Sequence, residues 1–300
     1  MNILLTGSSG FLGKYLTEEL INYHNLFTLS RKNSTYNCQL DSEIPHFEHC
    51  FDLVIHSAGK AHIVPNTIDE MDEFYKNNVD GTRNLLAGIL KVGIPRQFVF
   101  ISSVSVYGLI NGENIDESAP LLANDPYGKS KIMAEEIIKK WCEENNVVYT
   151  ILRLPLVVGA NPLGNLRLMI NAISKGYYFN IDGGKSKKSM VLASDVAKFI
   201  LLASQKGGIY NLTDGYHPSF YELSRYISKK LGKSNVLNIP FTIAKFISIV
   251  GDKIWSSCPI NSNKLVKITS TLTFDDTKAR DSFKWEPTNV LDGFNLTSNV

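Results

Sequence analysis

The amino terminus places an apolar run, a glycine-rich turn and an amphipathic helical pattern in immediate succession. Residues 2–6 form the run, residues 7–13 form the turn, and Leu16, Leu20 and Ile21 then recur on one helical face. Glycines at this spacing tighten the turn, bring backbone N–H groups close to a pyrophosphate and let the helix sit against the strand. The cofactor-binding residues predicted in this turn are Gly7, Gly10, Phe11, Leu12 and Gly13.

Further along the chain, apolar runs typical of buried strands alternate with helical patterns. Strands are predicted near residues 2–6, 26–30, 52–57, 97–101 and 148–153, and helices near 11–23, 68–92 and 127–145. Such alternation indicates an α/β fold, a doubly wound parallel sheet of the Rossmann type. The stretch 33–48 is brief and leaves room only for a short third strand around 38–40, so we expect a trimmed sheet edge on the adenine side.

The second half is less regular. After the fifth strand the pattern loosens, and it returns to the sheet around 191–202 and 209–212. A chain of 300 residues is long enough for one large domain and a smaller lobe. We therefore predict a cofactor-binding Rossmann domain over residues 1–160, re-entered near 190–213, and a smaller carboxyl-terminal substrate lobe over 161–300.

Tyr127 and Lys131 stand four residues apart in one predicted helix, and the pair Ser102-Ser103 ends the apolar run 97–101 upstream. Residues at this spacing share a helix face, so the lysine can hold its charge beside the phenol. A phenol with a pKa near 10 must lose roughly three units to act as a base near neutrality, and an ammonium together with a bound nicotinamide cation can supply this shift. The set predicts proton transfer to and from alcohols and ketones.

A second pair, Tyr226 and Lys230, has the same spacing but no serine-tipped strand before it. The spacing alone is therefore a weak signal, and we expect this pair to lie on an ordinary helix surface. Tyr127 is favoured as the functional tyrosine because its serines end a parallel strand, and open α/β sheets bind ligands at the carboxyl ends of their strands.

Taken in order, these motifs resemble the extended short-chain dehydrogenase/reductase family, specifically its nucleotide-sugar epimerase/dehydratase branch, over nearly the whole chain. The matching stretches are 6–13, 52–59, 78–82, 102–108, 127–131, 152–159 and 283–287. The resemblance implies that Ser103 hydrogen-bonds the reacting sugar oxygen, that Tyr127 shuttles the proton, and that Lys131 also grips the nicotinamide ribose. Hydride then moves between the sugar carbon and the nicotinamide without a covalent enzyme intermediate.

The resemblance also implies binding roles for single residues. Asp41 matches an aspartate that meets the adenine amino group, Asn78 lies in a cofactor-binding stretch, and Pro155 matches a residue that packs near the nicotinamide. The substrate-binding residues implied are Ser103, Ser105, Asn165 and Lys188. Asn165 is expected to donate to a diphosphate, and Lys188 stands where the family often has arginine, so charge is kept but the bidentate fork is lost.

The end of the second strand bears on the choice of cofactor. NAD sites usually place a carboxylate there for the adenosine ribose, whereas arginine suits a 2′-phosphate. Residues 29–32 contain no acid, and Ser30 and Arg31 therefore favour NADP over NAD, with a solvated loop charge as the alternative reading.

The residues directly after Ser103 bear on which reaction of this family the chain performs. The 4,6-dehydratases of the family carry an Asp-Glu pair directly after the catalytic hydroxyl, and this chain has Val104-Ser105 there. Dehydration is therefore disfavoured. We predict 4-keto reduction of a nucleotide-linked hexose, with UDP-hexose 4-epimerisation close behind. A cofactor-sensing regulator on the same fold is disfavoured because such proteins usually lose the Ser/Tyr/Lys set.

Composition limits the partners. A net charge of +2 indicates no nucleic-acid surface. The four cysteines, Cys38, Cys50, Cys142 and Cys258, show no Cys-x-x-Cys spacing, and His46, His49 and Cys50 lack a second ligand cluster, so no metal site is predicted.

We expect a cytoplasmic protein, because no signal peptide opens the sequence, and no membrane insertion, because the apolar stretch 239–250 is too short to cross a bilayer. The predicted partners are a nucleotide-diphosphate sugar and a second copy of the chain. In that homodimer the helices near 68–92 and 127–145 would form an isologous four-helix interface.

Overall fold

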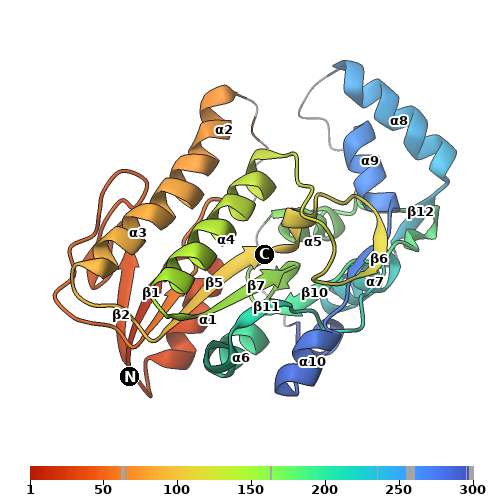
Figure 1. The fold of residues 1–300 in the computed structure, drawn as a ribbon. Coiled ribbons are helices and arrows are strands. Elements are labelled where there is room, and N and C mark those ends of the chain that lie inside the picture. The colour runs from red at the N-terminus through yellow and green to blue at the C-terminus, as the bar shows by residue number, and fades with distance from the viewer. Residues whose placement is uncertain are drawn as a thin grey trace.

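The computed structural model describes residues 1–61, 65, 67–162, 164–234, 236–254, 261–294 and 296. A seven-stranded parallel sheet forms its centre, in the order β11-β7-β5-β4-β1-β2-β3 (Figure 1). The strands are β1 (Asn2–Thr6), β2 (Asn25–Ser30), β3 (Tyr36–Asn37), β4 (Leu53–His56), β5 (Gln97–Ser103), β7 (Val148–Leu154) and β11 (Gly208–Asn211). The strand order reverses between β1 and β4, which is the switch point of a doubly wound sheet. The predicted α/β fold is confirmed.

Helices cover both faces of the sheet. Those on one face are α1 (Phe11–Leu20), α6 (Ala193–Lys206) and α10 (Thr277–Phe283). Those on the other face are α3 (Gly81–Leu90) and α4 (Pro126–Glu144). Beside α4 lies α2 (Ile68–Tyr75), which continues into α3 through a π-helical segment, Lys76–Asp80 (Figure 1).

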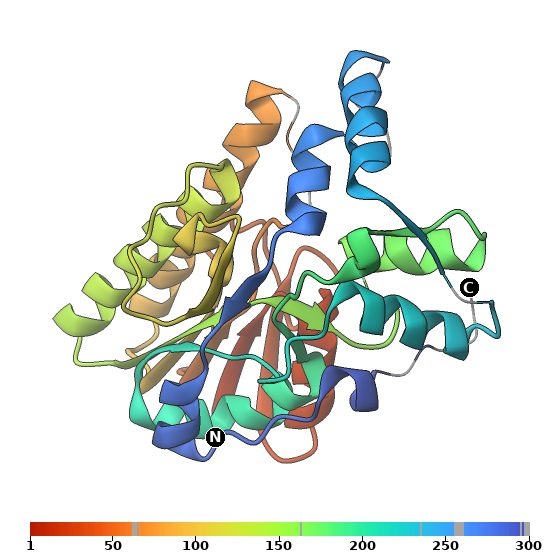
Figure 2. The same cartoon turned by 90° about the vertical axis from the view of Figure 1, so that its right-hand side faces the viewer.

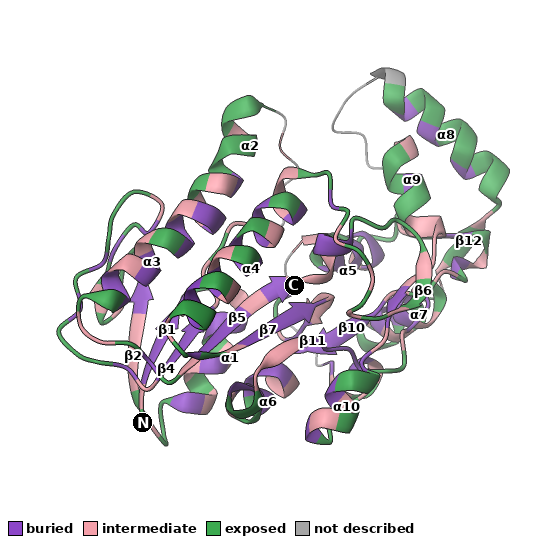
Figure 3. Ribbon diagram, in the orientation of Figure 1, coloured by how far each residue is buried: buried purple, intermediate pink, exposed green. Residues whose placement is uncertain are grey.

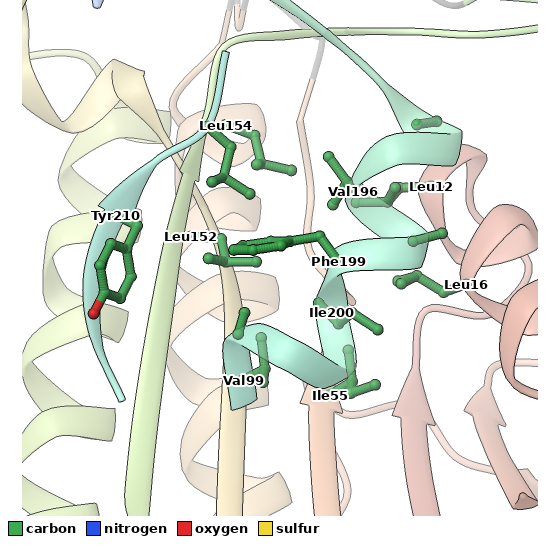
Figure 4. Close-up of a cluster of buried hydrophobic side chains, with 14 of the residues drawn as sticks. Leu12, Leu16, Ile55, Val99, Leu152, Leu154, Val196, Phe199, Ile200 and Tyr210 are labelled. Carbon is green, nitrogen blue, oxygen red and sulfur yellow. The ribbon is translucent and has the colours of Figure 1, made fainter. Parts of the chain in front are cut away.

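Buried side chains concentrate in the sheet and on the helix sides that face it (Figure 3). The strands read as unbroken apolar runs because a parallel sheet covered on both faces has no solvent side, and all four residues of β4 are buried. Figure 4 shows the layer in which α1 and α6 pack on the sheet. Its labelled side chains are Leu12, Leu16, Ile55, Val99, Leu152, Leu154, Val196, Phe199, Ile200 and Tyr210.

A smaller lobe stands beside the carboxyl ends of β5 and β7 (Figures 1 and 2). It contains three two-stranded sheets, which pair β8 (Leu156–Val158) with β10 (Met190–Leu192), β9 (Phe179–Ile181) with β12 (Leu237–Ile239), and β6 (Gly112–Ile115) with β13 (Leu272–Phe274). Its helices are α5 (Gly164–Ser174), α7 (Phe220–Lys230), α8 (Phe241–Ile254), α9 (Ser262–Thr269) and α11 (Val290–Gly293).

Several predicted boundaries differ from those observed. The helix expected over 68–92 is interrupted by the π-helical segment, and the third strand covers Tyr36–Asn37 instead of 38–40. The chain after that strand makes a turn in which Glu43 N–H donates to the Gln39 carbonyl, so buried Cys38 and Leu40 enter the core from a loop. Their apolar character predicted burial correctly but not strand pairing.

The two halves also interlock more than the predicted boundary at 160 implies. β10 pairs with β8 of the lobe rather than with the main sheet, whereas β11 joins that sheet as expected. Phe283 and Trp285 return to pack on the sheet with α6. Cys258 lies outside the described residues, and among those described no helix is long and apolar enough to cross a membrane.

Candidate active site

The glycine-rich turn after β1 is tight enough to require its glycines. Gly7 has a φ of +73°, in the left-handed region, and a Cβ there would lie 2.7 Å from the Ala58 nitrogen. A Cβ on Gly13 would lie 2.0 Å from the Gly7 carbonyl oxygen, so the helix packs directly on the turn. α1 begins after Gly10 without a side-chain cap. Its first backbone N–H groups are thus available to an anion, and the turn fits the diphosphate of a nicotinamide dinucleotide.

Tyr127 lies in the first turn of α4, opposite the end of β5. Asp125 caps this helix by accepting a hydrogen bond from Gly128 N–H at 3.0 Å, and Pro126 occupies the first turn, where proline is favoured. Burial raises the pKa of the half-buried Tyr127 phenol, a hydrogen bond with Ser103 opposes this rise, and the Asp125 charge adds to it. The Ser103 hydroxyl also donates to Ser105 Oγ at 3.1 Å. The structure therefore brings Ser103, Ser105 and Tyr127 together.

The direction of the Tyr127 shift differs from the lowered pKa expected from the sequence. The protein places the phenol where desolvation outweighs its neighbours. A nicotinamide cation bound beside the phenol would supply a positive charge that lowers this pKa.

Lys131 is only 5% exposed. Its ammonium donates to the Ile101 carbonyl at 2.9 Å and stands 4.5 Å from the centre of the Phe100 ring. Burial lowers the pKa of Lys131 to about 8, against the opposing effect of the Glu135 carboxylate. The lysine is thus held at the carboxyl end of β5 with a charge that titrates just above neutrality.

This titration predicts a pH dependence for cofactor binding. A pKa near 8 leaves Lys131 mostly charged at pH 7 and mostly neutral at pH 9, so affinity for the anionic dinucleotide should fall by about tenfold across that range. Calorimetric titrations of the wild type and of Lys131→Met at both pH values check this. His56 does not contribute to this change of affinity with pH, because burial lowers its pKa to about 3 and it is therefore neutral at both pH values. Equal slopes in the two proteins would contradict the prediction.

Asn78, in the π-helical segment, ties the loop after β4 to α4. Its amide nitrogen donates to Ser130 Oγ at 2.8 Å and to the Lys60 carbonyl at 3.2 Å, and its Oδ1 accepts from Lys60 N–H at 2.7 Å. A Cβ on Gly59 would lie 2.9 Å from that Oδ1 and 3.3 Å from the Lys131 ammonium. All the hydrogen bonds of the Asn78 side chain described here are made with other protein groups. Its predicted role in cofactor binding would therefore be indirect, through the position of the loop after β4.

Behind Asn78 lies a buried hydrogen-bonded chain that sequence reasoning missed. His56 Nδ1 lies 2.7 Å from the Thr6 hydroxyl, and His56 Nε2 lies 3.0 Å from the Thr82 hydroxyl, which donates to the Asn78 carbonyl. Because the Thr82 hydroxyl donates its hydrogen to the Asn78 carbonyl, it can only accept from His56, so Nε2 carries the proton. Nδ1 is then unprotonated and accepts from the Thr6 hydroxyl. Thr6 in turn accepts from Ala58 N–H. This chain links the ends of β1 and β4 to the π-helical segment.

A second buried network, also not predicted from the sequence, includes Glu135, whose charge acts on Lys131. Arg153 and Glu135 form a buried ion pair, with guanidinium–carboxylate distances of 2.7 and 3.2 Å. Ser102 donates to the same carboxylate at 2.5 Å, and Arg153 donates to the Tyr107 hydroxyl at 3.1 Å. The two serines of the predicted motif therefore face different ways: Ser102 into this network and Ser103 towards Tyr127.

The adenine-side residues lie at the end of β2 and beyond it. The Ser30 hydroxyl donates to the Lys32 carbonyl at 2.7 Å, so it is engaged within its own loop. Arg31 is exposed, and Asp41 is half-buried beside Leu40. Of the predicted pair, Arg31 is the residue with an exposed side chain.

Of the predicted substrate residues, Asn165 and Lys188 lie on the lobe, whereas Ser103 ends β5 and Ser105 follows it. Asn165 is exposed in the first turn of α5, and Pro155, a predicted cofactor residue, connects β7 to β8. Burial lowers the pKa of half-buried Lys188 to about 8, and the nearby Lys267 ammonium of α9 adds to that shift. Two lysines distant in the sequence are thus close enough to repel each other. Together they form a basic pair suited to a diphosphate.

Tyr226 lies elsewhere, in α7 of the lobe. Its hydroxyl donates to the Phe294 carbonyl, its ring stacks on Phe294, and the Lys230 ammonium stands 5.5 Å from the ring centre. These contacts hold Phe294 against α7.

Comparison with known proteins identifies the family of the chain. The NAD dependent epimerase/dehydratase family matches residues 3–213. An Escherichia coli O157:H7 relative, N-acetyl-alpha-D-glucosaminyl-diphospho-ditrans,octacis-undecaprenol 4-epimerase, is 28% identical over 99% of this chain and 94% of its own. A Dictyostelium discoideum relative, sterol-4-alpha-carboxylate 3-dehydrogenase (decarboxylating), is 31% identical over 93% of this chain and 94% of its own.

Among solved structures, UDP-glucose 4-epimerase from Thermotoga maritima, with UDP-glucose, superposes with a TM-score of 0.76 at 22% identity. The superposition covers 98% of this chain and 96% of that one. At this level of identity the likeness shows the fold.

Proposed function

The chain belongs to the NAD-dependent epimerase/dehydratase family, and we propose that it is a 4-epimerase of a hexose carried on a diphosphate. The observation that carries the proposal is the meeting of Ser103 and Tyr127 at the edge of the sheet where Lys131 and the glycine turn lie. The Escherichia coli relative named as a 4-epimerase supports this activity at least as well as the 4-keto reduction favoured from the sequence.

The chain's own groups have distinct tasks in this reaction. The Ser103 hydroxyl holds the reacting sugar oxygen, and Tyr127 removes its proton and later returns it. Lys131, fixed by the Ile101 carbonyl, keeps a positive charge at the ribose and near the phenol. A nicotinamide held by the glycine turn and Lys131 would supply reversible hydride transfer at the sugar carbon, which is the chemistry that inversion at that carbon requires.

The two residues after Ser103 limit the proposed chemistry to proton and hydride transfer. Val104 and Ser105 follow Ser103 in a 3-10 turn, so no carboxyl group stands where dehydratases carry their acid and base. Ser105 instead accepts from Ser103 and orients it. Neither side chain can take up or release a proton at the carbon that loses water, and the proposal therefore excludes dehydration.

The substrate is proposed to bind through its diphosphate. Lys188 and Lys267 supply two ammonium groups on the lobe, and Asn165 lies at the start of α5. Two of the proteins named above, the Escherichia coli relative and the Thermotoga maritima structure, are named for sugars carried on diphospho-undecaprenol and on UDP, and the diphosphate is common to both. A basic pair recognises this shared group whatever carrier follows it.

The decisive test is incubation with UDP-glucose and UDP-N-acetylglucosamine, first without added cofactor and then in parallel with added NADPH and with added NAD. An epimerase should convert either compound to a mixture of C4 epimers with no net change in absorbance at the NADH band. Consumption of added NADPH in proportion to product would instead establish a reductase, and steady accumulation of NADH a dehydrogenase. Absence of any product with UDP-linked and lipid-linked sugars alike would overturn the proposal.

Arg31 favours 4-keto reduction as the second candidate, because exposed arginine at the end of β2 suits the 2′-phosphate of NADPH. Under this reading Arg31→Ala should weaken NADPH binding by about 1.5 to 3 kcal/mol, the range for a hydrogen bond to a charged group. NADH binding should not change. The neighbouring exposed Lys32→Ala is the matched control, and calorimetry on all three proteins measures both affinities. NADH binding as tightly as NADPH in the wild type would remove the argument for a reductase.

A homodimer over the helices remains a prediction. α2 and α4 lie side by side, and Met71 and Met133 expose their side chains on them. An isologous pairing of these helices would cover both. A monomer mass by light scattering at micromolar concentration would contradict it.

A further inference from the structure

Helix α8 turns its bulky apolar side chains outward and its small ones inward. Ala244, Ser248 and Gly251 are buried. The residues that define the outward surface, called here the α8 face, are Phe241, Ile243, Phe246, Ile247, Ile249 and Val250, all of them exposed. Phe246 is 70% exposed, and the helix is coloured as exposed along most of its length (Figure 3). A contiguous apolar surface of this kind marks an interaction site.

The charge around this face is one-sided. Within the described stretches 241–252 and 261–270 there are three lysines, Lys245, Lys264 and Lys267, and a single acid, Asp252. The Asp252 carboxylate is engaged by the Ser262 backbone N–H and hydroxyl. Outward apolar side chains flanked by lysines are what an interfacial helix presents to an anionic bilayer. At fourteen residues α8 can lie on such a surface but is too short to cross it.

Helix α8 packs on the helix that carries one lysine of the proposed diphosphate site. Ala244 of α8 packs against Leu265 of α9, and two residues further on α9 carries Lys267, whose charge acts on Lys188. Both views show α8 and α9 rising on the same side of the molecule as the amino-terminal ends of α2 and α4 (Figures 1 and 2). Tyr127 lies at that end of α4. The apolar face and the reacting edge of the sheet therefore lie on the same side of the molecule.

We propose that the α8 face docks the enzyme on an anionic bilayer, and that the sugar is presented there on a membrane-held lipid diphosphate. The second half rests on the proposed function. A diphosphate held by Lys188 and Lys267 places its carrier beside α8, where an acyl or prenyl chain stays in the bilayer. A soluble UDP-sugar has no acyl or prenyl chain, so it would not account for an exposed phenylalanine–isoleucine surface at that position.

Vesicle flotation tests the docking. The wild type should float with equimolar phosphatidylglycerol and phosphatidylcholine vesicles and less with phosphatidylcholine alone. Phe246→Ser/Ile249→Ser should lower the partition coefficient by at least about tenfold, because two apolar side chains leave the interface. The control, Ile21→Ser/Leu90→Ser, changes two side chains that are 58% and 50% exposed at the ends of α1 and α3, and it should float like the wild type.

Each other outcome overturns the docking. A wild type that stays out of the vesicle fraction, or a double variant that floats as well as the wild type, would do so. So would light scattering in which the wild type is a dimer and the α8 variant a monomer, since a second copy would then cover the face.

Activity separates the docking from the proposed function. The α8 variant should turn over soluble UDP-sugar at the wild-type rate, and it should act at least about tenfold more slowly than the wild type on a polyprenyl-diphosphate sugar in the same vesicles. Flotation without epimerisation of either substrate would remove the proposed function and leave the docking in place. Equal rates of the two proteins on the lipid-linked sugar would remove the membrane-held substrate.

Discussion

Replacing Tyr127 with phenylalanine is expected to lower kcat by at least about a hundredfold. The change deletes the hydroxyl that meets Ser103 but keeps the ring, which packs against Phe74 with centroids 6.1 Å apart. The glycine turn and Lys131 are untouched, so affinity for the nicotinamide cofactor should be nearly unchanged. Steady-state rates on the substrate found by the epimerase assay, together with calorimetric titration of the cofactor, separate the two effects.

Tyr226→Phe is the matched control, because it removes the same atom from the other tyrosine with a lysine four residues on. Its hydroxyl holds the Phe294 carbonyl, so the loss should appear as about 1 kcal/mol of stability and not as a change in kcat. Equal losses of activity in the two variants, or none in Tyr127→Phe, would show that the wrong tyrosine has been assigned to proton transfer.

The sequence could place Tyr127 and Ser103 because each depends on local rules. Lys131 follows from helical spacing, Ser103 from its place at the end of an apolar strand, and parallel strands bring their carboxyl ends to one edge. The glycine turn is equally local, since Gly7 and Gly13 meet within a few residues of chain. These features can therefore be predicted correctly even where the predicted ends of helices and strands are wrong by several residues.

Long-range polar partners could not be predicted in the same way. His56 lies in an apolar run, and its partners Thr6 and Thr82 are 50 and 26 residues away. Glu135 and Arg153 belong to different elements, and each alone reads as an ordinary helix or strand residue. Only the register of the sheet and the rotation of α4 decide that their side chains meet.

The outward position of the α8 face could not be predicted from hydrophobicity. From the sequence, the apolar stretch 239–250 shows only that it is too short to cross a bilayer. Small residues at Ala244, Ser248 and Gly251 allow α8 to lie close on the lobe, so they occupy the inner side and leave the large residues outside. Hydrophobicity alone does not tell which side of a helix is covered.

Arg153→Leu is expected to lower the free energy of unfolding by about 3 to 5 kcal/mol, because it leaves the buried Glu135 carboxylate without its ion-pair partner. The Tyr107 hydroxyl loses the same donor but keeps its own bond to Asn211 Oδ1 at 2.8 Å. Urea unfolding of wild type and variant measures the difference. Arg280→Leu is the control, since its ion pair with Asp276 is partly exposed and should contribute less than about 1 kcal/mol.

The double variant Glu135→Leu/Arg153→Leu distinguishes a loss of pairing from a loss of packing. Removing both charges should recover much of the stability, because no unpaired ion remains buried. Activity should still change, since Glu135 is the charge that opposes the burial-driven fall in the pKa of Lys131. Without it Lys131 loses its proton at a lower pH, and cofactor affinity should decline at a lower pH than in the wild type. A double variant as unstable as Arg153→Leu would show that the pair acts through shape, and an unchanged pH profile would separate it from Lys131.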